Sequence, residues 1–175
     1  MCEESISKTA NSNNIAKFML MDSGRRSRII NAAMSEFRHG YKKATTDDIV
    51  KRAGISKGLL FHYFGTKERL YAFLVNYAID VINSEYISMM NFEQSDLLEV
   101  LWQMALLKRD ISLRYPSLYD FLKSAHVHMS EIPNEEVHGL IVQKREYALD
   151  EFYKRCDISL FAEDIDPKKA IDLIW

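Results

Sequence analysis

The segment that most constrains the fold runs from Thr45 to Lys67 and reads TTDDIVKRAGISKGLLFHYFGTK. Thr45 is a favourable helix N-cap, and Asp48 completes a capping-box pattern that satisfies backbone N–H groups at a helix start. Gly54 predicts the end of this helix, because glycine adopts the left-handed C′ conformation without steric cost. We therefore expect a short helix of about two turns before Gly54.

A second short helix is expected directly after that glycine, with Ser56 as its cap. Leu60 and Phe64 share one face of this helix at i, i+4 spacing, which predicts that this face is buried. The other face carries Lys57, Gly58, His62 and part of Phe61, with Leu59 beside them. Two short helices joined by a glycine-containing turn have the spacing of a DNA-binding helix-turn-helix. Spacing alone fits an ordinary helical hairpin with a solvated polar face equally well.

The net charge of −2 conceals an asymmetry along the chain. Residues 21–80 hold 11 Lys and Arg against 6 Asp and Glu, whereas residues 81–175 hold 10 against 17. A charge split of this kind favours an N-terminal part that faces nucleic acid and a different role for the remainder. The alternative is that these charges are ordinary solvated surface residues with no common partner.

Composition favours an all-α fold, because Pro and Gly number only 3 and 6 and no long stretch alternates apolar and polar residues. The two cysteines, Cys2 and Cys156, provide neither a disulfide framework nor a CxxC metal site, which suits a cytoplasmic protein. We see no membrane span and no export signal. Glycine-rich phosphate loops and nucleophile elbows are absent from the sequence, so we expect neither an enzyme nor a cofactor.

A metal site is also not expected at His126 and His128. Residues two apart in a helix lie on nearly opposite faces, so these side chains could share an ion only in an extended segment.

The other expected elements follow from helical periodicity and from glycine and proline positions. Residues 1–23 are polar and are expected to form a flexible tail, although Ile15 to Met21 is apolar enough for a helical turn against the body. Helices are expected at about 27–39, 67–90, 95–114, 116–126 and 134–156, with a last one from Pro167. This last helix stops at Trp175 without a cap or a polar end.

Three motifs in residues 28–72 resemble the DNA-binding domain of the TetR family of bacterial transcriptional repressors. They are I-x-x-A-A-x-x-x-F-x-x-x-G-Y from Ile29, T-x-x-x-I-x-x-x-A-G-I-S-K-G from Thr45 and H-Y-F-x-x-K-E from His62. The resemblance implies an N-terminal three-helix DNA-binding domain at 24–70 and a helical ligand-binding and dimerisation domain at 71–175. Members of the family continue through the cut-off helix and one more, and these two usually form the dimer interface. The resemblance therefore leads us to expect either a fragment or a dimer that is built differently.

The resemblance also implies which residues contact DNA. Lys67 matches the family's phosphate-contacting lysine, Thr45 and Tyr63 are further backbone contacts, and the first expected helix places Arg28 near the backbone. The base-reading positions correspond to Lys57, Gly58, Leu59 and His62. Family members often carry a hydroxyl where Leu59 and Phe61 stand, so Leu59 could read only a thymine methyl or a sugar.

In the acidic half, the resemblance implies a small-molecule inducer pocket between helices. Its candidate lining residues are Trp102, Met104, Tyr115, Tyr119, Phe121 and Tyr147. The alternative is that most of these side chains form the core. The function expected is a ligand-relieved repressor that binds a near-palindromic operator as a homodimer. The alternative is a helical protein-interaction module without DNA binding.

Overall fold

The computed structural model describes residues 13–89, 97–133 and 135–153, with 161, 162, 164–167 and 169. Within these residues every regular element is helical, which confirms the all-α prediction. After a helix at residues 13–19 come α2 (Ser23–Phe37), α3 (Thr46–Ala53), α4 (Lys57–Phe64), α5 (Lys67–Met89), α6 (Leu97–Arg114), α7 (Leu118–Val127), the 3-10 turn η1 (Met129–Glu131) and α8 (Glu135–Tyr153). No helix among the described residues is long and apolar enough to cross a membrane.

The N-caps predicted for the two short helices are present, but the capping box is not completed, because the Thr45 amide donates to Glu36 and the Asp48 carboxylate accepts from the Thr45 hydroxyl instead. The Asp48 amide donates to Thr45 Oγ1 at 3.1 Å, and the Leu59 amide donates to Ser56 Oγ at 3.2 Å. Gly54 has φ 65° and ψ 41°, the left-handed conformation that ends α3. Local capping therefore sets the bounds of α3 and α4.

Two helix starts differ from the prediction. The helix expected from residue 27 begins at Ser23, because Asp22 Oδ1 accepts a hydrogen bond from the Arg25 amide at 2.9 Å. The helix expected from Pro116 begins at Leu118. The end predicted at residue 156 and most of the helix predicted from residue 167 lie outside the described residues.

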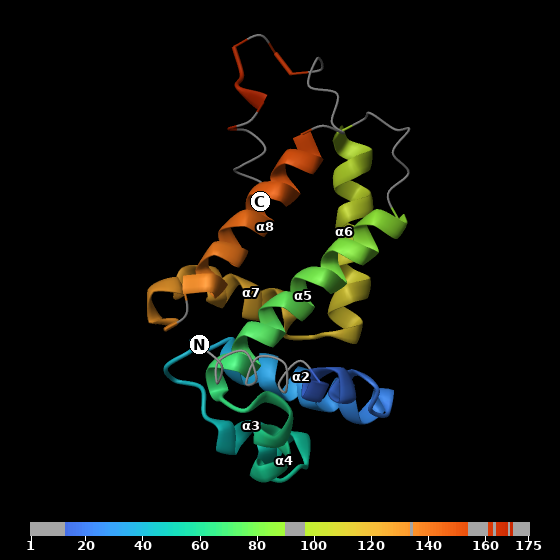
Figure 1. Cartoon of the computed structure of the whole chain (residues 1–175). Coiled ribbons are helices and arrows are strands. Elements are labelled where there is room, and N and C mark those ends of the chain that lie inside the picture. Colours follow the sequence, from blue (N-terminus) through green and yellow to red (C-terminus); the bar gives the residue numbers. More distant parts are fainter. Residues whose placement is uncertain are drawn as a thin grey trace.

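The α3–α4 pair forms one end of the molecule, and α5 leads from it towards α6 and α8 (Figure 1). One cluster of buried side chains extends from Phe18 of helix 13–19 through α2 and α7 to Val137 and Ile141 of α8. Three of its aromatic rings contact one another in a row. The ring centroids of Phe37 and Tyr71 are 4.9 Å apart, and those of Tyr71 and Phe121 are 5.4 Å apart. The boundary predicted between residues 70 and 71 therefore falls inside a continuous core.

The segment predicted as a flexible tail is partly helical. Residues 13–19 form a helix and Phe18 is fully buried, so the apolar stretch from Ile15 to Met21 does pack against the body as predicted. The burial of Phe18 explains the difference, because removing a phenylalanine side chain from water stabilises the segment by about 1.5–3 kcal/mol.

Candidate nucleic-acid interface

The second helix of the pair, α4, presents one face to the core and the other to solvent. Leu60 and Phe64 are each 1 % exposed. Lys57, Gly58 and His62 are exposed on the opposite side, and Leu59 is half-buried but lies outside the core cluster. The orientation predicted for this helix is therefore confirmed.

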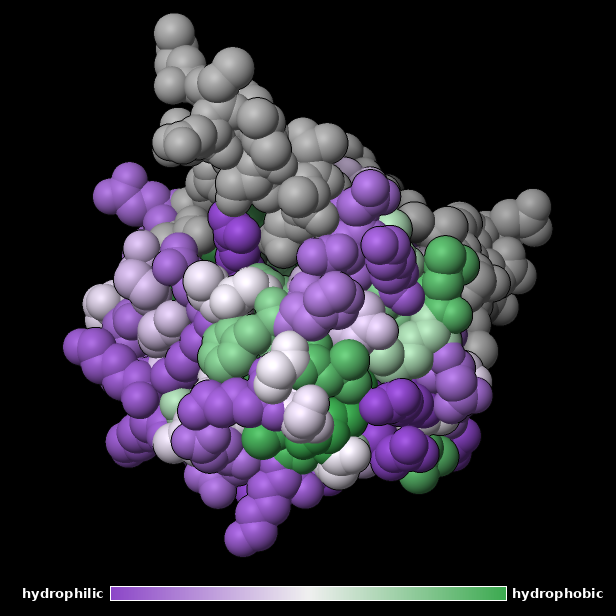
Figure 2. All heavy atoms as spheres, turned by 60° about the horizontal axis from the view of Figure 1, so that its bottom comes forward, coloured by the Kyte–Doolittle hydropathy of each residue, from purple (hydrophilic) through white to green (hydrophobic). Residues whose placement is uncertain are grey.

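Figure 2 brings the end of the molecule with α3 and α4 forward and shows a hydrophobic zone within a mainly hydrophilic rim. A surface of this kind can make apolar contacts at its centre and polar or ionic contacts around it. It suits a partner with apolar and charged features, as DNA has in its groove methyl groups and its phosphates.

Lys57 is held by an ion pair across the two helices. Its Nζ lies 2.8 Å from Asp47 Oδ1, and both side chains are largely exposed. Asp47 belongs to the first turn of α3, where the helix dipole favours a carboxylate, whereas Lys57 begins α4, where the dipole opposes a cation. The carboxylate therefore offsets the unfavourable position of the ammonium group.

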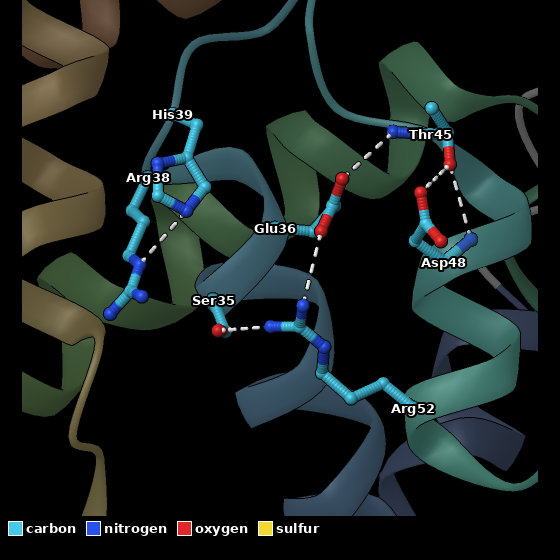
Figure 3. Close-up of polar contacts among 7 residues, drawn as sticks. All are labelled: Ser35, Glu36, Arg38, His39, Thr45, Asp48 and Arg52. Carbon is cyan, nitrogen blue, oxygen red and sulfur yellow. Dashed lines mark hydrogen bonds and ion pairs between the residues drawn. The ribbon is translucent and has the colours of Figure 1, made fainter.

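A polar network fixes α3 against α2 (Figure 3). Arg52 donates to Ser35 Oγ at 2.6 Å and lies 3.7 Å from a Glu36 carboxylate oxygen. The other Glu36 oxygen accepts from the Thr45 amide at 3.3 Å, while the Thr45 hydroxyl donates to Asp48 at 2.7 Å. Glu36 thus links both ends of α3 to α2, a role that sequence reasoning missed.

Lys67 begins α5 and lies over aromatic rings. Its Nζ is 4.6 Å from the centre of the Tyr41 ring and 6.0 Å from that of Phe37, which is cation–π distance. Burial lowers the pKa of Lys67, and the nearby Glu36 carboxylate opposes this shift. The ammonium group is therefore partly desolvated beside the start of a helix, where Thr66 Oγ1 accepts from the Arg69 amide at 3.1 Å.

The remaining predicted contacts lie in different surroundings. Thr45 and Arg28 are exposed. Tyr63 is half-buried, and its ring packs edge-on against Phe18 with 5.5 Å between centroids. The structure thus gathers the four predicted base-reading residues on α4, together with Tyr63, and places the other predicted phosphate contacts on neighbouring elements.

Comparison with protein families gives a match over residues 29–73 to the bacterial regulatory proteins of the tetR family. Residues 29–73 therefore form a TetR-family domain. The matched segment runs from α2 into α5 and includes the whole α3–α4 pair, so the chain is a DNA-binding transcriptional regulator. No individual curated protein matches the sequence.

The residues predicted to line a ligand pocket in this TetR-family chain have unlike surroundings. Phe121 is fully buried in the core, whereas Trp102 and Tyr147 are 63 % and 52 % exposed. Tyr115 hydrogen-bonds through its hydroxyl to Tyr77 at 2.7 Å. Met104 is half-buried, and Lys108 Nζ lies 5.2 Å from the centre of the Tyr119 ring. The pocket stays a prediction.

Proposed function

We propose that this TetR-family regulator is a repressor that binds a near-palindromic DNA operator as a homodimer and is released by a small-molecule ligand. The observation that carries the proposal is the outward face of α4. Leu60 and Phe64 anchor this helix, while Lys57, Leu59 and His62 remain accessible. A helix presented in this way fits the major groove, where each base pair offers a distinct pattern of donors and acceptors.

Each outward residue supports a different kind of base contact. The Lys57 ammonium group can donate to guanine O6 and N7, and Leu59 can lie against a thymine methyl. Apart from its chain neighbours and the nearby backbone of α4, no atom of the described chain lies within 4 Å of the position that a Cβ at Gly58 would occupy, so a base edge or sugar could approach the backbone there. His62 adds a ring that can donate or accept.

Phosphate contacts would come from Lys67, Thr45, Tyr63 and Arg28. In the free chain Lys67 lies over Tyr41, and the Thr45 hydroxyl is bonded to Asp48. DNA binding would exchange these internal contacts for phosphate oxygens, which accept strong charge-assisted hydrogen bonds. Such contacts position the protein without reading sequence.

Release by a ligand would act through α5. This helix begins shortly after the end of α4. Its Glu85 lies 2.7 Å from Arg114, the last residue of α6, and its Tyr77 hydroxyl hydrogen-bonds to that of Tyr115, the residue directly after α6. A ligand among α5–α8 that prefers another position of α5 would change the separation of the two α4 helices. Half-sites in successive major grooves lie about 34–36 Å apart, so a changed separation weakens binding.

The proposal is tested by titrating a pool of random duplexes, and separately heparin, with the chain at increasing salt. A DNA-binding regulator binds duplex DNA at low salt, with log K falling by about 0.9 per phosphate contact for each unit of log salt concentration. It also enriches one sequence from the pool. Binding to heparin without enrichment of any duplex would favour a protein-interaction module, and sedimentation at micromolar concentration tests the homodimer.

A further inference from the structure

Helix 13–19 lies against the last turn of α4. Its Phe18 side chain is 0 % exposed and meets three rings edge-on. The ring centroids lie 4.8 Å from Phe64 and 5.5 Å from both Tyr63 and Phe73. Two of these partners belong to α4 and one to α5, so Phe18 packs where the two helices meet.

Asn14 supplies a cap for α4 from outside the motif. The last carbonyl groups of a helix have no partner within the helix. The Phe61 carbonyl accepts from Gly65 at 2.8 Å and the Phe64 carbonyl accepts from Thr66 at 2.9 Å. The carbonyl of His62 accepts instead from Asn14 Nδ2 at 3.0 Å. Helix 13–19 therefore holds the backbone of His62, whose side chain is exposed to solvent.

Arg26 fixes the other end of helix 13–19. Its guanidinium group donates to the carbonyls of Met19 and Met21, the latter at 3.4 Å. A cation at the C-terminal end of a helix is favourable, because the helix dipole places partial negative charge there. Since Arg26 belongs to the second turn of α2, this contact ties helix 13–19 to α2 while Phe18 and Asn14 tie it to α4.

We propose that helix 13–19 positions the recognition helix, with Phe18 and Asn14 as its positioning residues. The inference rests on the proposed function of α4. That helix has only 8 residues, and helices this short depend on tertiary packing for their stability. Leu60 and Phe64 hold α4 from the core side. Phe18 and Asn14 fix its last turn, and with it the direction of the His62 side chain.

The test compares Phe18→Ala and Asn14→Ala with Leu20→Ala in the full chain. Leu20 is 86 % exposed, so it is a matched truncation in the same segment that leaves the contacts with α4 intact. Each variant is titrated with the duplex enriched by the wild type and with a shuffled duplex. Hydrogen exchange of the free protein is followed separately in α2 and in residues 61–66.

Phe18→Ala is expected to lower the ratio of specific to shuffled affinity by about tenfold, and Asn14→Ala by about threefold, the loss of roughly one base contact or less. Exchange in residues 61–66 becomes faster while exchange in α2 does not change. Leu20→Ala leaves both measurements at the wild-type level. If Phe18→Ala does not fold by circular dichroism, Phe18→Leu and Asn14→Ala decide by the same criteria.

Two results would overturn the positioning role: an unchanged affinity ratio in folded variants, or exchange that accelerates equally in α2 and residues 61–66. The second result would show that Phe18 supports the core in general. If the wild type enriches no duplex, the proposed function fails, and the exchange measurement still tests whether helix 13–19 holds α4.

Discussion

Replacing Leu59 by alanine tests whether α4 reads DNA with an apolar side chain. Leu59 is half-buried and is absent from the core cluster, whereas its neighbour Leu60 is 1 % exposed. Truncating a leucine outside the core costs on the order of 0.5 kcal/mol of stability, against about 2–5 kcal/mol for a buried leucine. Leu60→Ala is therefore a matched control that should unfold far more easily.

The effect of Leu59→Ala on binding should be confined to one base pair in each half-site. A leucine cannot pair with a base edge but can lie against a thymine C5-methyl, a contact worth about 1 kcal/mol at the lower end of base discrimination. The variant should thus lose about fivefold in affinity per half-site, roughly thirtyfold for an operator with two half-sites, and keep its affinity for shuffled DNA. Replacing the contacted thymine by uracil should cost the wild type about as much and the variant almost nothing.

The reasoning is refuted by a combination of two measurements. If Leu59→Ala lowers the melting temperature as much as Leu60→Ala and leaves the preference at every operator position unchanged, Leu59 belongs to the core. The outward face of α4 would then have to be assigned to other residues.

Three further predictions concern charges. Asp47→Asn removes a carboxylate beside the DNA-facing surface and frees Lys57. Affinity for random duplexes, measured by anisotropy, should rise about threefold, which is the effect of removing the repulsion between a carboxylate and a phosphate roughly 7 Å apart in water. Asp120→Asn on α7 makes the same charge change away from this surface and should have no effect. Lys67→Gln should weaken binding to the specific and the shuffled duplex equally and reduce the salt slope by about 0.9 for each bound protomer. An unchanged slope would remove Lys67 from the interface. The hydrogen bond to Arg114 holds the pKa of Glu85 below its usual value, so its stabilising contribution is present above that value and is lost as pH falls through the lowered pKa. In chemical denaturation between about pH 5 and pH 3, the wild type should lose more stability than Glu85→Gln. The difference should be less than about 1 kcal/mol, because the pair lies at the surface with its Arg114 side chain half exposed. Equal losses would show that the pair contributes nothing.

The α3–α4 pair could be predicted from sequence because its determinants are local. Thr45, Ser56 and Gly54 act on backbone groups within four residues, and the spacing of Leu60 and Phe64 fixes the buried face. Each of these signals is readable without knowing where the rest of the chain lies. The bounds of α3 and α4 therefore followed directly.

Contacts between distant segments could not be predicted in the same way. Asn14 and His62 are 48 residues apart, and nothing in the local pattern of Asn14 indicates a cap for α4. The ring contacts of Phe18 likewise depend on three residues in α4 and α5. The apolar stretch from Ile15 to Met21 signalled that this segment packs, but not against which helix.

Side chains of the acidic half show a related limit. An aromatic residue on a helix is compatible with a core, a pocket or an exposed surface, and sequence spacing did not separate Phe121, which is fully buried, from Trp102, which is largely exposed. The surroundings of these residues are decided by how α6, α7 and α8 pack. Their assignment to a ligand pocket remains a prediction for this reason.

The most direct test of the account is selection from a random duplex pool by the wild type and by a variant in which Lys57, Leu59 and His62 are all alanine. These side chains lie outside the core cluster, so the variant should fold and retain salt-dependent affinity for random DNA. We expect the wild type to enrich one operator with related half-sites and the folded variant to enrich none. Enrichment of the same operator by the variant would contradict the assignment of α4 as the recognition helix.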